Sequence, residues 1–114
     1  MKLTVKPWGS EDLIFQGNGY AVKQILFKKQ KRTSLHYHNI KHETIIVYSG
    51  ELTVFLDDNS ENPKTILLKP SETIAIAPKT IHRMSSETTD TTYFEAQSDH
   101  LDDVIRIEDD EGRS

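Results

Sequence analysis

The sequence predicts an all-β domain built as a sandwich or a barrel. Its apolar residues fall into short runs that are rich in β-branched side chains, which is typical of strands. Turn-forming residues such as Gly17, Gly19 and Pro70 separate these runs, and no segment shows the apolar periodicity of an amphipathic helix. Many short strands with regular turns are typical of sandwiches and barrels.

The first half of the chain alternates between expected strands and turns. Residues 12–15 read as a strand that leads into the Gly17-Asn18-Gly19 turn, and residues 20–27 read as the next strand. The basic run at residues 28–32 is expected to be a strand end and a solvated loop, since short charged runs are common on surfaces. Three more strands are expected at residues 33–38, 43–48 and 51–56, the last two joined by a tight hairpin at Ser49-Gly50.

Polar segments divide the second half of the chain. Residues 57–63 have strong turn chemistry, and residues 85–92 read as another polar turn. Strands are expected between and after these segments, at residues 64–69, 72–77, 93–97 and 104–107. We find no internal repeat and no linker, so the whole chain, residues 1–114, is expected to form a single domain.

The composition argues against several classes of partner. The formal net charge is −4, which disfavours broad electrostatic binding to nucleic acid or to anionic lipid. There is no cysteine, so neither a disulfide nor a thiolate metal site can form. No apolar stretch approaches the roughly 18 residues of a membrane helix, and the start has no signal-like apolar segment. We therefore expect a cytoplasmic protein with no nucleic-acid partner and no membrane partner.

Four side chains form a candidate metal site. His36 and His38 are two residues apart, a spacing that places both on one face of a strand, about 7 Å apart. Glu43 begins the next expected strand, and His82 follows a strand end and a proline turn. A lone His-x-His pair is weak evidence because such pairs occur by chance. The joint pattern of two histidines, a glutamate and a distant third histidine is much more specific.

This joint pattern resembles the two motifs of the cupin superfamily, which are small β-barrels that usually hold a metal. The resemblance implies a single cupin barrel of the jelly-roll type. It also implies one divalent ion held by His36, His38, Glu43 and His82. Histidine and carboxylate ligands suit zinc, manganese, iron, nickel and cobalt alike, so the metal stays open. The chain departs from the motifs in their turns, at Gln30, Glu72, Lys79 and Ser86.

Three longer stretches narrow the resemblance. Residues 6–27, 32–38 and 97–113 are similar to the cupin domain of type II mannose-6-phosphate isomerases, which is often fused behind a guanylyltransferase. The family often has glutamine where this chain has His36. The resemblance implies a metal-dependent sugar-phosphate isomerase, a phosphorylated sugar as substrate and a homodimer. Trp8, in the opening that matches the family, is expected to serve in packing or in dimer contact.

Other polar residues are candidates for substrate contact or for chemistry. Arg32 and Ser34 are in phase with His36 and match the family, so both are expected to bind substrate if the strand extends that far. Arg32 would suit a phosphate, although it could equally be a solvated loop residue. Lys23 and Glu95 are the catalytic candidates. Lys23 shares a strand face with apolar residues, unless that face is exposed, and Glu95 matches a family position.

Two other functions stay open at this point. The ligand set also serves iron-dependent dioxygenases among the cupins, and a non-catalytic module that binds sugar or regulates would share the same residues. An anion-binding cation inside the barrel would favour the isomerase. An apolar pocket beside the metal would favour the dioxygenase, and a collapsed barrel mouth would favour the module.

Overall fold

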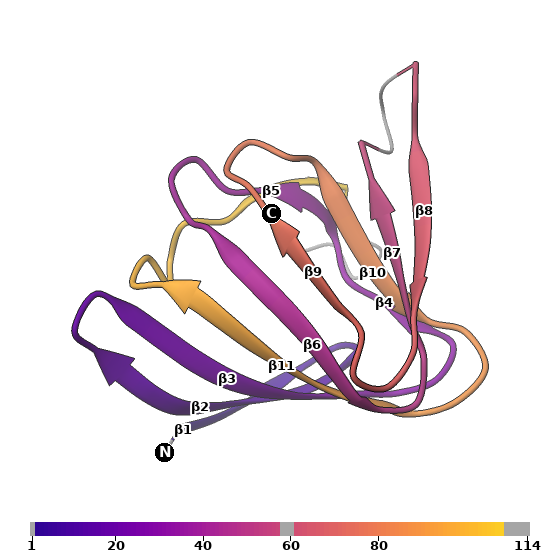
Figure 1. Cartoon of the computed structure of the whole chain (residues 1–114), viewed down its shortest axis with the longest axis horizontal. Helices are drawn as coiled ribbons and strands as arrows, with labels where there is room; N and C mark the ends of the chain where they lie inside the picture. The colour runs from indigo at the N-terminus through magenta and orange to yellow at the C-terminus, as the bar shows by residue number, and fades with distance from the viewer. Residues whose placement is uncertain (1, 58–60, 109–114) are drawn as a thin grey trace.

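The computed structural model describes residues 2–57 and 61–108, and every regular element in these ranges is a β-strand. The strands form two antiparallel sheets that make up the two layers of the fold (Figure 1). Within the same ranges, no helix has the length and hydropathy needed to cross a membrane. The all-β class predicted from the sequence is therefore confirmed.

The first sheet joins strands that lie far apart in the sequence. Its spatial order is β1-β2-β3-β11-β6-β9, so that β11 lies between β3 and β6 and ties the C-terminal part of the chain to the N-terminal part. The six strands are β1 (Lys2–Lys6), β2 (Gly9–Gly17), β3 (Tyr20–Phe27), β11 (Thr91–Ser98), β6 (Glu43–Ser49) and β9 (Thr73–Ile76).

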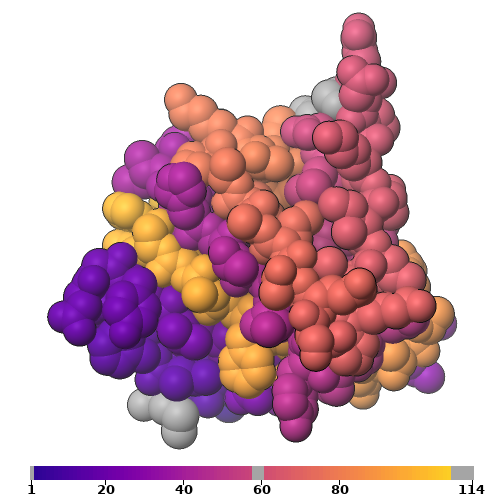
Figure 2. Space-filling view, viewed as in Figure 1, coloured from indigo at the N-terminus to yellow at the C-terminus, as the bar shows by residue number. Residues whose placement is uncertain are grey.

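The second sheet has the spatial order β12-β5-β10-β7-β8, and a short sixth strand, β4, also pairs with β10. Its strands are β12 (Ile105–Glu108), β5 (Leu35–Tyr37), β10 (His82–Ser86), β7 (Leu52–Leu56), β8 (Lys64–Leu68) and β4 (Lys31–Arg32). The β7–β8 hairpin projects from the rest of the molecule, as Figure 2 shows. Its strands contribute Leu52, Val54 and Leu68 to the buried core, and the partly buried Leu56 and Ile66 pack against that core.

The inner face of the first sheet changes from apolar to polar along its strands. In β6, Ile45 and Val47 are buried while the alternate residues are exposed, as the two-residue period of a strand requires. Glu43 continues the same buried face beyond Ile45. In β11 the buried face runs from Tyr93, in the apolar core, to Glu95. The apolar core thus fills one part of the interior, and polar side chains occupy the other.

Trp8 anchors the N-terminal hairpin in the apolar core. Its ring stacks on Phe27 with centroids 4.9 Å apart and an interplanar angle of 9°, and Tyr93 also packs against Phe27. The side chain is only 6% exposed, so of the two roles considered for Trp8 the structure shows packing. The buried core residues are Trp8, Ile25, Phe27, Ile45, Val47, Leu52, Val54, Leu68, Ile76, Met84 and Tyr93.

Strand β1 was not expected from the sequence. It pairs along its whole length with β2, yet Leu3 and Val5 are exposed, at 66% and 81%. Its sequence, Lys-Leu-Thr-Val-Lys, does alternate polar and apolar residues as a strand does, although neither apolar side chain is buried. The signal for this strand was therefore present in the sequence but short, and it was overlooked.

Strand β10 corrects the expectation of a polar turn that begins at residue 85. Ser85 and Ser86 belong to this strand, and both are buried. Both hydroxyl groups have hydrogen-bond partners. The Ser85 hydroxyl donates to Glu87, and the Ser86 hydroxyl lies 2.7 Å from that of Thr91. Buried serines with hydrogen-bond partners look like turn residues in a sequence, since serine is common in turns.

Candidate metal centre

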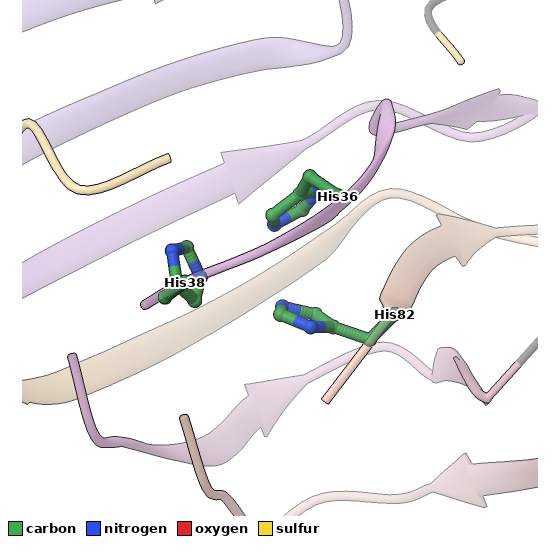
Figure 3. Close-up of side chains that lie close together, drawn as sticks. All are labelled: His36, His38 and His82. Atoms are coloured by element: carbon green, nitrogen blue, oxygen red, sulfur yellow. The ribbon is translucent and has the colours of Figure 1, made fainter. Parts of the chain in front are cut away.

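Three buried histidines converge on the inner face of the second sheet. His36 in β5 and His82 in β10 are cross-strand partners, so their side chains share one face of the sheet. His38 follows β5 on the same side, and Figure 3 shows the three rings gathered together. Their ring centroids lie 4.3 to 5.2 Å apart, and one nitrogen from each ring lies within 4.8 Å of the others. The predicted histidine cluster is therefore present.

Backbone carbonyls fix the orientation of each ring. A carbonyl oxygen can only accept a hydrogen bond, so the Nδ1 atom beside it must carry the proton. In a neutral imidazole this leaves Nε2 with a free lone pair, the arrangement found in metal-bound histidines. The three Nδ1 contacts are His36 with Ser34 O at 2.7 Å, His38 with Asp103 O at 2.5 Å and His82 with Thr80 O at 2.8 Å.

Glu43 adds a carboxylate oxygen to the same point. Its Oε1 lies 3.3 Å from His38 Nε2 and 3.1 Å from His82 Nε2. All three atoms are buried, and none has a hydrogen-bond partner in the part of the chain that the structure describes. Three buried acceptors without a donor leave a strongly unfavourable arrangement unless a cation lies among them. This donor set fits a divalent ion.

The surroundings of two of these ligands also set their protonation states. Burial, followed by the neighbouring His82, lowers the pKa of His36 to about 3, so His36 is neutral at pH 7. Burial alone would raise the pKa of Glu43, but without a metal the hydrogen bonds that His38 and His82 donate when protonated at Nε2 outweigh it and hold this pKa well below its usual range. Neutral imidazole and ionised carboxylate are the forms that bind metal.

A cavity of about 260 Å³ lies beside the histidines. All three candidate ligands of the first motif, His36, His38 and Glu43, line it. The other charged residues of its lining are Lys6, Glu11, Lys23, Lys41, Glu95, Asp102 and Arg106. The lining is therefore rich in both signs of charge, unlike that of a typical apolar ligand pocket.

The structure places three of the four other predicted site residues at this cavity. Ser34 and Glu95 are buried and line it, and Lys23 lines it while its Nζ contacts Glu11 Oε2 at 3.0 Å. Arg32 is exposed in β4 and does not belong to the lining. The strand does not extend from His36 back to Arg32, because residues 33 and 34 interrupt it, and the assumed phase is lost. A phosphate-binding role for Arg32 stays a prediction.

A buried hydrogen-bond chain leads from Glu95 to a residue that the sequence did not single out. Gln97 Nε2 donates to Glu95 Oε2 at 3.1 Å, and Lys41 Nζ donates to Gln97 Oε1 at 3.2 Å. Burial raises the pKa of Glu95 to about 8, and the charge of Glu43 adds to this shift. The strand parity of Gln97 with Glu95 was a usable signal, whereas Lys41 lies in an irregular segment that has none.

Asp103 is a second residue that sequence reasoning missed. Its carboxylate accepts hydrogen bonds from the backbone N–H groups of Asn39, Ile40 and Lys41, at 3.0, 2.7 and 2.9 Å. These hydrogen bonds lower the pKa of Asp103, and the one from Ile40 has the largest effect. Its own carbonyl oxygen accepts from His38. Asp103 therefore holds both the candidate metal ligand His38 and the segment that follows it.

Comparisons with known proteins agree on one family. A family model described as mannose-6-phosphate isomerase C-terminal matches residues 2–109. The alginate biosynthesis protein AlgA of Pseudomonas aeruginosa is 34% identical over 113 residues, which cover 96% of this chain and 22% of AlgA. Mannose-1-phosphate guanylyltransferase 2 of Escherichia coli O157:H7 is 41% identical over 71 residues, which cover 62% of this chain and 14% of that protein. The chain thus spans about a fifth or less of the length of these relatives.

Solved structures share the arrangement of the strands. The capsular polysaccharide assembling protein CapF of Staphylococcus aureus aligns with a TM-score of 0.82 at 18% identity, covering 94% of this chain and 31% of CapF. KdgF from Halomonas sp. aligns with a TM-score of 0.77 at 16% identity, covering 90% of each chain. The oxalate decarboxylase of Lactobacillus farciminis aligns with a TM-score of 0.79 at 12% identity, covering 93% of this chain and 33% of that enzyme. At these identities the likeness concerns the fold alone.

Proposed function

Because the chain belongs to the family of mannose-6-phosphate isomerase C-terminal domains and has the cupin fold, we propose that it is a metal-dependent isomerase of sugar phosphates. The observation that carries this proposal is the cluster of His38 Nε2, His82 Nε2 and Glu43 Oε1, three buried acceptors without a donor among the described residues, beside a cavity that also contains Glu95. An aldose–ketose isomerase needs both a cation and a proton-transferring group at one site.

The metal ligands in this proposal are His36, His38, Glu43 and His82. A divalent ion held there supplies Lewis-acid stabilisation for the negative charge that develops on the substrate oxygens. The protein contributes the neutral Nε2 atoms, which the carbonyl contacts of Nδ1 keep directed toward the ion. Zinc, manganese, iron, nickel and cobalt all remain compatible with this set of ligands.

Glu95 is the group that moves the proton between the adjacent carbons of the sugar. Its pKa of about 8 is close to neutral pH, and general acid–base catalysis is most efficient when the pKa lies near the working pH. Gln97 holds Oε2 of the carboxyl group, which leaves Oε1 for the substrate. Lys23, which lines the same cavity, is the second catalytic candidate and is held by Glu11.

The charged lining of the cavity favours the isomerase over the two alternatives. A dioxygenase for an apolar substrate would need an apolar pocket beside the metal, but cations and carboxylates line this one. A binding module with a collapsed mouth would have no cavity beside the histidines. Ser34, which lines the cavity, is proposed to contact the substrate, and a cation of the site is proposed to bind its phosphate. Arg32, the candidate from the sequence, is also proposed to contact the substrate, although it lies outside the lining.

The relatives support a sugar phosphate as the substrate class. Their names concern mannose 1-phosphate and the synthesis of alginate, and this chain covers about a fifth or less of their length. The activities of those whole proteins are therefore only proposals for this chain. The homodimer and the cytoplasmic location expected from the sequence are likewise proposals.

A direct assay of the metal-loaded protein tests this function. The protein is loaded in turn with each of the five metals and incubated with mannose, glucose or fructose 6-phosphate, and the products are separated by chromatography. We expect interconversion of an aldose and a ketose phosphate, and its loss in a Glu95→Gln variant that retains the metal. A fully loaded wild-type protein that converts none of these sugars contradicts the isomerase proposal.

A further inference from the structure

We infer that Arg106 binds the anionic group of the ligand, an inference that rests on the proposed function because it names the phosphate contact of the same site. Arg106 lies in β12 and lines the cavity beside the histidines. Its Nε atom is buried and has no hydrogen-bond partner among the described residues. A buried guanidinium N–H without an acceptor is costly, and an oxyanion of a ligand would supply that acceptor.

The strand register places Arg106 beside the metal centre. In the pairing of β12 with β5, Arg106 is the direct partner of His36. Side chains of directly opposed residues lie on the same face of a sheet, with Cβ atoms about 4.5 to 5.5 Å apart. The guanidinium of Arg106 therefore shares the inner face with a candidate metal ligand. When Arg106 binds the anionic group of a ligand, the uncharged part of that ligand would extend to the metal centre.

The other cations of the cavity already have partners. Lys23 Nζ contacts Glu11 at 3.0 Å, and Lys41 Nζ donates to Gln97 at 3.2 Å. Lys6 also takes part in an interaction within the protein. Arg106 is thus the lining cation whose buried donor is left for a ligand, within residues 2–57 and 61–108.

The chemistry of the guanidinium selects the ligand class. Arginine presents several N–H donors in a planar fork that matches two oxygens of a phosphate, whereas lysine acts as a point charge. The same fork also matches a carboxylate, so the phosphate monoester follows from this chemistry together with the sugar phosphate of the proposed function. This assignment differs from the sequence-based candidate Arg32, which is exposed and lies outside the cavity lining.

Binding measurements on the metal-loaded protein separate these roles. Titration calorimetry with mannose 6-phosphate, mannose and inorganic phosphate is run on the wild type and on Arg106→Gln, Arg106→Lys, Arg32→Gln and Lys64→Gln. Lys64 is an exposed cation on the projecting hairpin and serves as the matched control. Metal content and thermal unfolding are measured for each protein, because loss of the metal or of the fold would imitate a loss of binding.

We expect Arg106→Gln to weaken the binding of mannose 6-phosphate and of inorganic phosphate by about ten- to a hundredfold at unchanged metal content. The affinity for mannose should not change. Arg106→Lys should recover part of the loss, and Lys64→Gln should match the wild type. Wild-type affinity for both phosphate ligands in Arg106→Gln overturns the inference, as does a larger loss in Arg32→Gln than in Arg106→Gln. A wild type that binds no phosphate ligand also overturns it.

The outcomes separate this inference from the proposed function. If the wild type isomerises hexose phosphates while Arg106→Gln binds them normally, the isomerase stands and the role of Arg106 fails. If inorganic phosphate binds through Arg106 but no hexose phosphate is converted, the anion site stands and the isomerase proposal fails.

Discussion

Replacing Glu95 with glutamine should change how the stability of the metal-free protein depends on pH. Glu95 is buried, and its pKa is raised from an ordinary value of 4.5 to about 8 by burial and by Glu43. Between these two values the folded protein holds a proton that the unfolded chain releases. The free energy of unfolding contributed by this group is therefore fully present below pH 4.5 and is lost as the pH rises to about 8.

The size of this effect follows from the shift. The gap between 4.5 and about 8 is about 3.5 pH units, and one unit corresponds to about 1.4 kcal/mol, so the loss approaches roughly 5 kcal/mol. Glu95→Gln removes the titration but keeps an oxygen that can accept from Gln97. The variant should match the wild type near pH 4.5 and exceed its free energy of unfolding by several kcal/mol at about pH 8.

Urea unfolding followed by circular dichroism, in the presence of a chelator, measures this difference at intervals between pH 4.5 and about 8. Only the difference between the two proteins is interpreted, because other groups titrate in the same window. A difference that stays constant across the window would refute the reasoning, since it would mean that Glu95 ionises in the folded protein as it does in the unfolded chain.

Three further predictions concern packing, the support of the metal ligands and a turn. Trp8→Ala should lower the free energy of unfolding by about 3 to 5 kcal/mol in urea titrations, because it removes the ring stacked in the core. Asp103→Ala should weaken metal binding about ten- to a hundredfold in a competition assay, whereas the control Asp12→Ala in β2 should not. Gly50→Ala should lower the thermal unfolding midpoint, because φ is +86° and a Cβ would lie 2.5 Å from the backbone oxygen of Asp90.

Those elements that bury an apolar face could be predicted from the sequence. Strand β3 was expected at residues 20–27 and has those bounds, and β6 begins at Glu43 as expected. Strand β10 buries serines that hydrogen-bond locally, so it lacks the apolar alternation on which the prediction depends, whereas β1 has that alternation at Leu3 and Val5 and was overlooked. A strand whose buried face is polar, such as β10, thus cannot be recognised from apolar alternation.

The candidate site was predictable where the residues lie in strands of known phase. His36 and His82 became neighbours because β5 and β10 pair, which the motif spacing implied through resemblance. Arg32 was placed by extending the phase of β5 through two residues that are not in a strand. Asp103 and Arg106 reach the site through the packing of a C-terminal segment, and sequence spacing holds no information about such long-range contacts.

Metal stoichiometry tests the central claim most directly. Elemental analysis after reconstitution and removal of free metal is carried out on the wild type, on His82→Ala and on His100→Ala, whose histidine is exposed. We predict one divalent ion per chain in the wild type and in His100→Ala, and almost none in His82→Ala. A wild type without bound metal, or a His82→Ala variant that retains a full equivalent, would contradict the account.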